Sequence, residues 1–188
     1  MKKAARPVTT TKASLLSLCE KGEWTKLLKR LQAGLSPQEV NAADDHGLTP
    51  LHHASLDENV EVVVALLEAG ADASAGDDEG TTALHIAATL SNVALARALL
   101  DGGAGAAAAD VNQRDQHGST ALHFAANPET AEGAATSAEV VSLLLDRGAD
   151  AEIRDKTGKI AVDYAAQPER YHYRTLDTAL PSRADTTR

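Results

Sequence analysis

The sequence contains few of the residues that usually carry covalent chemistry or fill a compact core. Its 188 residues include a single cysteine, Cys19, and only 3% of them are aromatic. One cysteine excludes a disulfide bond within the chain, and the shortage of rings leaves leucine, valine and alanine to form the core. No apolar run approaches the ~18 residues of a membrane-spanning helix, and no signal-peptide-like segment is evident. We therefore expect a cytoplasmic or nuclear protein, with an exported bacterial protein carrying an unusual signal as the alternative.

Basic residues are scarce in the middle of the chain. The net charge is −9 overall, but residues 1–34 carry eight Lys/Arg and two Glu, whereas residues 35–110 carry thirteen Asp/Glu and only Arg97. Such an acidic centre disfavours nucleic acid, whose phosphates need Lys and Arg, and it attracts a basic partner. The alternative is that these acids only form a solvated face that keeps the protein soluble.

What the chain does contain is a repeated stretch. Residues 47–54, GLTPLHHA, recur as GTTALHIA at 80–87 and GSTALHFA at 118–125, with a weaker copy, GKIAVDYA, at 158–165. A double-leucine phrase ending in Gly-Ala follows each of the first three copies. An aspartate stands three residues before the first glycine of every copy: Asp44, Asp77, Asp115 and Asp155.

The spacing and the amino-acid sequence of these copies are typical of one repeat family. The first two copies lie 33 residues apart, which is the period of the ankyrin repeat, and Thr49 to Ala54 match its T-P-L-H-x-A motif in full. Over residues 14–180 the chain resembles the ankyrin-repeat family. The resemblance implies an all-α fold, a solenoid of stacked helix-turn-helix units with hairpin-like loops. It also implies a non-enzymatic adaptor, scaffold or inhibitor that binds another protein, and we expect a monomer without a cofactor.

The chain divides into an arm, an array and a tail. Residues 1–13 are basic and are expected to be a disordered arm, and residues 181–188 are expected to be a flexible tail. Between them we expect five repeats, at residues 14–43, 44–76, 77–114, 115–154 and 155–180.

The first repeat departs most from the motif and is expected to cap the array. Ser14 is expected to cap its first helix, and leucines at helical spacing predict a second helix at about residues 23–32. We expect Trp24 to pack in the core rather than to stack on a ligand. Cys19 has no histidine near it in the sequence and is expected to be a small core residue rather than a nucleophile.

Two later repeats are longer than the family period. The extra residues of repeat three are expected at 105–109, in the loop that leaves the repeat, and those of repeat four at 127–138, between its two helices. Pro128 and Gly133 mark the second insertion as a loop. Repeat five is expected to end in a short capping helix that includes Tyr173, Leu176 and Leu180.

Among the residues that could bind a metal ion or catalyse a reaction, histidine is the one that recurs in the repeat. His52, His85 and His123 occupy one position of the repeat, and by resemblance this histidine hydrogen-bonds backbone and connects neighbouring loops. The positions lie a repeat apart, too far to share a metal ion whose ligand bonds are ~2 Å. No metalloprotease, redox, phosphate-binding or esterase motif is present. A non-enzymatic protein is therefore expected, and a hydrolase that uses Cys19 or a histidine is the remote alternative.

The expected binding surface is the concave groove of repeats two to four. By resemblance, contacts come from the residues after the repeat Asp, the residue after the Gly and those past the Ala-Ala pair. Two further residues, Asn127 and Thr157, occupy positions that the same rule gives. The groove changes from acidic to neutral to basic along the array, so we expect a partner segment rich in Lys or Arg. The alternative is a structural array whose binding surface is the two insertions. The expected contacts are Asp45, His46, Leu48, Leu56, Asp57, Asp78, Glu79, Thr81, Thr89, Leu90, Gln116, His117, Ser119, Lys156 and Lys159.

Overall fold

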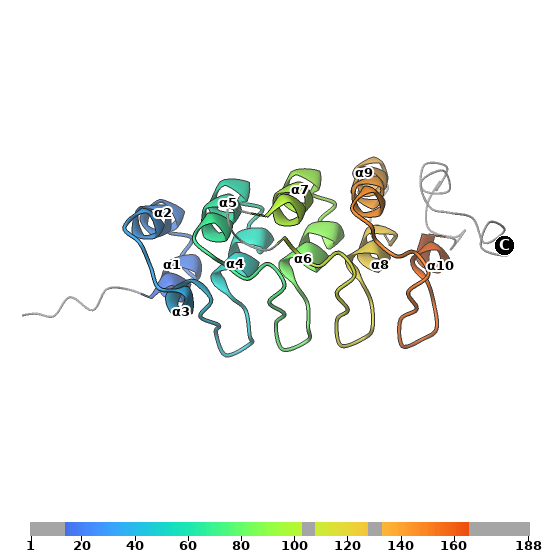
Figure 1. The fold of residues 1–188 in the computed structure, drawn as a ribbon, viewed down its shortest axis with the longest axis horizontal. Helices are drawn as coiled ribbons and strands as arrows, with labels where there is room; N and C mark the ends of the chain where they lie inside the picture. The colour runs from blue at the N-terminus through green and yellow to red at the C-terminus, as the bar shows by residue number, and fades with distance from the viewer. Residues whose placement is uncertain (1–13, 103–107, 128–132, 166–188) are drawn as a thin grey trace, which may run out of the picture.

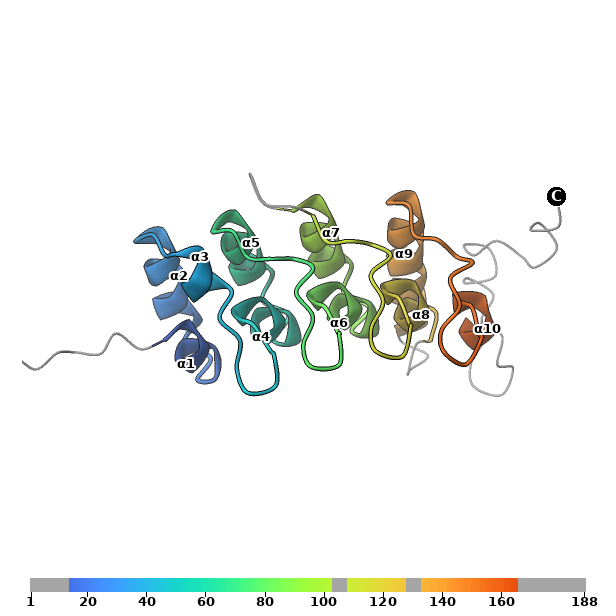
Figure 2. The same ribbon diagram turned by 60° about the horizontal axis from the view of Figure 1, so that its bottom comes forward.

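Helices stacked in two rows make up the molecule, as Figure 1 shows. The computed structural model describes residues 14–102, 108–127 and 133–165. Successive repeats lie side by side along one axis, and the long loops that join them project toward one side, which Figure 2 shows from a second direction. The predicted all-α solenoid is therefore confirmed.

The first helix of each repeat lies in the row nearer the projecting loops (Figure 1). This row consists of α1 (Leu15–Cys19), α4 (Pro50–Leu56), α6 (Ala83–Thr89), α8 (Ala121–Ala125) and α10 (Ala161–Ala165). The second helices form the other row, which consists of α2 (Trp24–Gln32), α5 (Val60–Glu68), α7 (Val93–Asp101) and α9 (Gly133–Asp146). Extended pairing within the described ranges is limited to an isolated bridge between Gly76 and Thr82.

Short polar residues and a proline determine where the helices begin. The side chain of Ser14 accepts a hydrogen bond from the backbone N–H of Ser17 at 3.1 Å, so Ser14 caps α1 as predicted. Pro50 is the first residue of α4, a position where proline costs no intrahelical hydrogen bond. The side-chain oxygens of Asn59 and Asn92 cap α5 and α7. These caps satisfy amides that a helix terminus would otherwise leave unpaired.

The core is a line of interfaces between neighbouring repeats. Leu66 of α5, Leu99 of α7 and Leu144 of α9 have no exposed surface, and they hold the same position of the double-leucine phrase. Helix α7 packs against both α5 and α9. Complete burial of a leucine side chain stabilises a fold by about 1.5–3 kcal/mol. Because that burial depends on the adjacent repeat, stability comes from stacking rather than from any single repeat.

A short helix follows α2 that the repeat pattern did not predict. Helix α3 (Pro37–Val40) begins after Ser36, whose hydroxyl accepts from the backbone N–H of Glu39 at 3.3 Å. The Glu39 carboxylate accepts in return from the backbone N–H of Ser36 at 3.0 Å. The two bonds form a capping box, and the Ser-x-x-Glu spacing was the signal that could have revealed this helix.

The insertion of repeat four is partly helical, so the loop predicted at 127–138 is wrong in its second half. Helix α9 starts at Gly133 and has 14 residues, whereas α5 and α7 have 9 each. Glycine is tolerated at a helix end, and the alanine-rich stretch after it favours helix. Ser137 is fully buried, and its hydroxyl lies 2.7 Å from that of Ser91 in repeat three. Packing against the neighbouring repeat thus stabilises the added helical turn.

The insertion of repeat three ends one residue earlier than predicted. The backbone N–H of Ala109 donates to the carbonyl of Leu99 at 3.0 Å. Ala71 makes the same bond to Leu66 in repeat two, at 2.9 Å. Ala109 therefore takes the regular place of the alanine in the Gly-Ala phrase, and it is not one of the extra residues.

Three predictions concern segments that lie outside the described residues. They are the arm at 1–13, the capping helix that would include Tyr173, Leu176 and Leu180, and the tail at 181–188.

Candidate protein-binding groove

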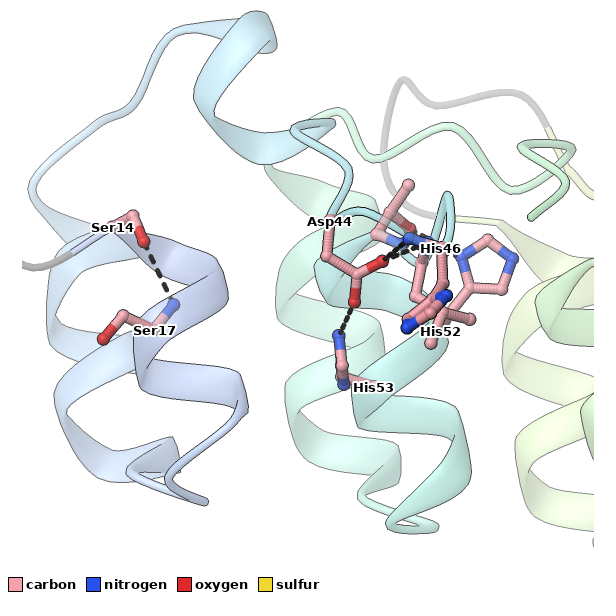
Figure 3. A network of polar contacts seen from close by, with 8 residues as sticks. Ser14, Ser17, Asp44, His46, His52 and His53 are labelled. Atoms are coloured by element: carbon pink, nitrogen blue, oxygen red, sulfur yellow. Dashed lines mark hydrogen bonds and ion pairs between the residues drawn. The ribbon is translucent and has the colours of Figure 1, made fainter. Parts of the chain in front are cut away.

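Each projecting loop, which we call a finger, is organised by its repeat aspartate. Asp44 Oδ1 accepts hydrogen bonds from the backbone N–H groups of His46 and Leu48, at 2.9 and 3.0 Å (Figure 3). Gly47 completes the turn with a φ of +78°, a conformation that glycine adopts without strain. Asp77, Asp115 and Asp155 accept the equivalent bonds in the later fingers. The recurring Asp-x-x-Gly spacing thus encodes the shape of the finger.

The hydrogen bonds that Asp44 accepts also affect its ionisation. Burial disfavours the charged form of this carboxylate, but hydrogen bonds from His46, Leu48 and His53 outweigh that effect and lower its pKa. Asp155 follows the same rule, because burial is outweighed by bonds from Tyr164 and Thr157, and its pKa lies well below the usual range. Both finger aspartates are therefore ionised at neutral pH.

Backbone hydrogen bonds join the fingers into a continuous strip. The N–H of Asp78 donates to the carbonyl of His46 at 3.1 Å, and the N–H of Lys156 donates to that of His117 at 2.8 Å. The bond between the middle fingers, from Gln116 to Glu79, is 2.7 Å long. The fingers of repeats two to five therefore present their tips as one surface.

The repeated histidine connects each first helix to the next finger. In His85, Nδ1 accepts from the backbone N–H of Thr82 at 3.0 Å, which places the proton on Nε2, and Nε2 donates to the carbonyl of Ser119 at 3.3 Å. His52 and His123 make the same pair of contacts, to the carbonyls of Thr81 and Lys159. The connecting role expected for this histidine is confirmed.

Burial and these contacts keep the three rings neutral. Desolvation is the main cause that lowers the pKa of His52, His85 and His123, and the carbonyl acceptors offset it only in part. Both nitrogens of each ring are already engaged, which leaves no lone pair for a metal ion. Across the described ranges, no group of three His, Cys, Asp or Glu side chains is placed to hold one.

Most of the predicted contact residues are exposed. Half-buried positions are Leu48, Thr81 and Ser119, and the carbonyls of the last two accept from histidines of the preceding repeat. The exposed positions are Asp45, His46, Leu56, Asp57, Asp78, Glu79, Thr89, Leu90, Gln116, His117, Lys156 and Lys159.

Comparison with known protein families identifies the repeat. A model of ankyrin repeats that spans three copies matches residues 15–115 and, in a second alignment, residues 73–155. The chain belongs to the ankyrin-repeat family. Ankyrin repeats are protein–protein interaction modules and are generally non-enzymatic. A search of curated proteins found no match to this chain. None of the helices in the described part of the chain is long and apolar enough to cross a membrane.

The ankyrin array brings several predicted contacts together around one pocket. A hollow of about 450 Å³ lies between the fingers and first helices of repeats three to five. Six predicted positions line it, and the sequence did not indicate that they would enclose a hollow. These positions are Thr89, His117, Ser119, Asn127, Lys156 and Thr157.

The pocket also includes two aromatic residues that the sequence analysis missed. Phe124 and Tyr164 hold the same position in successive ankyrin repeats, directly after the His slot, and both line the pocket. A signal for them was available in the sequence. The position directly after the His slot holds His53 in repeat two and Ile86 in repeat three, but a large aromatic ring in repeats four and five.

Leu56 and Leu90 are the most exposed large apolar residues near the predicted contacts. Leu56 ends α4 and is 50% exposed, and Leu90 follows α6 and is 40% exposed. Scattered exposed leucines are ordinary on protein surfaces. These two belong to consecutive repeats at corresponding helix ends, so a single extended segment could contact both.

Trp24 and Cys19 are structural residues, as predicted. Trp24 packs against the core, and its indole N–H donates to Asp57 at 3.2 Å. This bond links the first repeat to the second and engages one of the predicted contact carboxylates. Cys19 is only 4% exposed, and burial raises the pKa of its thiol to about 12. A thiol with that pKa is not a nucleophilic thiolate at neutral pH.

Proposed function

We propose that this ankyrin protein binds a Lys/Arg-rich segment of another protein in the groove formed by its finger tips and the ends of its first helices. In this role it acts as an adaptor, scaffold or inhibitor. The observation that carries the proposal is the acidic tip of two joined fingers. Asp45, Asp78 and Glu79 are exposed, and among the described residues none of them takes part in an ion pair.

The field of these carboxylates is not balanced locally. Arg97 is the only Lys or Arg between residues 35 and 110, and it lies on α7, in the row of helices farther from the fingers. An uncompensated acidic surface speeds the approach of a basic segment and selects against acidic ones. Leu56 and Leu90 would supply the apolar contacts, where most of the affinity of an interface usually resides.

A double charge reversal tests the acidic fingers. Asp78→Lys with Glu79→Lys should leave the melting temperature nearly unchanged, since exposed charges contribute little to stability. Selection from a phage-displayed library of random linear peptides should enrich Lys- and Arg-containing sequences on the unmodified protein. The double variant should lose that enrichment, and the affinity of a selected peptide for the unmodified protein should fall as salt is added.

Glu61→Lys with Glu68→Lys is the matched control. Both glutamates are exposed on α5, so this variant changes the net charge equally but leaves the fingers intact. It should retain peptide binding. If it loses binding as fully as the finger variant, net charge rather than the groove attracts the peptides. If neither variant loses binding, the insertions of repeats three and four become the better candidates for the binding surface.

A further inference from the structure

One position of the repeat decides whether the finger aspartate is fully hydrogen-bonded. It lies nine residues after the aspartate. In repeat two, His53 Nε2 lies 3.1 Å from Asp44 Oδ2 (Figure 3). In repeat five, the hydroxyl of Tyr164 donates to Asp155 Oδ2. A ring that carries a donor thus completes the coordination of the carboxylate in these two repeats.

Repeat four has Phe124 in this position, and phenylalanine has no donor. Asp115 Oδ1 accepts from the N–H groups of His117 and Ser119, at 2.8 Å each. Its Oδ2 accepts no hydrogen bond from any residue in the described ranges. Asp115 is only 9% exposed, and it lines the pocket between repeats four and five. This oxygen is not fully enclosed, so a donor that enters the pocket can bind it in place of solvent, and a hydrogen bond to a charged acceptor is among the stronger ones.

Aromatic rings form the walls of the same pocket. Phe124 and Tyr164 line it together with His123, whose ring meets that of Tyr164 edge-on at a centroid distance of 6.0 Å. Aromatic rings prefer such edge-on or offset arrangements with further rings. The walls therefore suit a flat, largely apolar guest.

The charges around the pocket are nearly balanced. Asp115 and Asp155 are opposed by Lys156, which lines the pocket, and by Lys159, whose Nζ lies 5.0 Å from the centre of the Tyr164 ring. A cationic guest would be placed beside these two lysines. A neutral ring with a hydroxyl donor meets the requirement without that repulsion.

We propose that this pocket binds a tyrosine side chain of the partner. Its ring packs against Phe124 and Tyr164, and its hydroxyl donates to Asp115 Oδ2. The arrangement copies the contact that Tyr164 makes with Asp155 in the next repeat. The inference rests on the proposed function, because the tyrosine belongs to the segment that lies along the groove, and it identifies a second element of that segment beyond its basic residues.

Phe124→Tyr is the decisive variant. It adds a hydroxyl at the position from which Tyr164 reaches its own aspartate, so it should satisfy Asp115 from within the chain and occupy the guest's place. Peptides selected on the unmodified protein should contain a tyrosine beside their basic residues. Replacing that tyrosine by phenylalanine should weaken binding to the unmodified protein about tenfold, the loss typical of a hydrogen bond to a charged group. The Phe124→Tyr variant should bind both peptides with equal, weaker affinity.

The outcomes separate this inference from the proposed function. Selected peptides that are basic but lack tyrosine would overturn the tyrosine pocket and leave the acidic groove standing. Tyrosine-containing peptides that bind independently of Asp78 and Glu79 would overturn the basic segment instead. Selection of no peptide would overturn both. If Phe124→Tyr fails to fold, the comparison of tyrosine and phenylalanine peptides on the unmodified protein decides, and equal binding of the two contradicts the pocket.

Discussion

At the residue scale, the Thr-x-x-His pair shows why this position requires histidine. The ring must accept a backbone N–H at the start of its own helix and donate to a carbonyl of the next finger, as His85 does with Thr82 and Ser119. A neutral imidazole provides one acceptor and one donor on opposite sides of a flat ring. Protonation would turn the acceptor into a donor facing another N–H. The array therefore depends on these histidines staying neutral.

That dependence predicts an acid-sensitive fold. The pKa values of His52, His85 and His123 are lowered in the folded protein from about 6.5. Below that pH the unfolded chain binds more protons than the folded one, so the free energy of unfolding falls as pH falls. The neutral rings contribute fully to the stability of the fold above pH ~6.5. Below that pH, protonation of each histidine lowers the free energy of unfolding by at most about 1.4 kcal/mol for each pH unit. Thermal melts at pH 7.5 and pH 5.5 should show a clear drop in melting temperature.

The exposed His46 offers the control for this titration. His46→Gln leaves the three buried rings in place, so its melting temperature should fall with pH by the same amount as that of the unmodified protein. A melting temperature that stays level between pH 7.5 and pH 5.5 would contradict the assignment of neutral, pH-sensitive rings.

At the scale of elements, a second recurring position connects the loops that leave the second helices. Asn112 donates through Nδ2 to the carbonyl of Gly148 at 3.1 Å and accepts from the N–H of Asp150 at 2.8 Å. Asn41 makes the same two bonds two interfaces earlier, to Gly70 and Asp72. These amides bridge consecutive repeats, a role that the sequence pattern did not indicate.

Ser74 holds the intervening position and provides a matched comparison. Its hydroxyl accepts one bond, from the N–H of Asp110 at 3.3 Å. Asn112→Ala removes two bonds and should lower the free energy of unfolding by about 1–2 kcal/mol. Ser74→Ala removes one long bond and should cost less than about 0.5 kcal/mol. Urea denaturation followed by circular dichroism measures both, and equal losses would show that these side chains do not bridge the repeats.

At the scale of the whole molecule, stability should be greatest in the interior of the stack. Helices α5 and α7 have a neighbouring repeat on each side, whereas α1 and α2 form one end (Figure 1). The described part of repeat five contains its finger and one helix, α10, of five residues. In a linear array each repeat is stabilised mainly by its neighbours, so the terminal repeats open first.

Hydrogen exchange tests this order. The amides of Leu66 and Leu99, whose side chains are fully buried, should exchange most slowly, and those of α1 and α10 should exchange earlier. Mass-spectrometric or NMR detection would resolve the repeats. Slowest exchange in α10 would contradict the expected order and would indicate that the C-terminal end is the most stable part of the array.

The sequence alone determined the fold because every repeat contains the residues of its own finger and cap. Asp44, Gly47 and Thr49 act on backbone within a few residues, so the spacing of such residues identified the repeat, and the resemblance to ankyrin repeats then implied the loops, the helices and the role of the histidine. The same resemblance implied the candidate contact positions, which lie at fixed offsets from these residues. The starts of α1, at Ser14, and α4, at Pro50, followed from local capping chemistry.

Tertiary structure decided what depends on the neighbouring repeat. Phe124 and Tyr164 lie 40 residues apart, and they line one pocket only because repeats four and five stack in register. Whether inserted residues lengthen a helix or a loop also depended on packing, as the contact of Ser137 with Ser91 shows. The bond from Trp24 to Asp57 likewise joins two repeats. Such contacts have no local pattern, because each needs a partner that the stacking brings close.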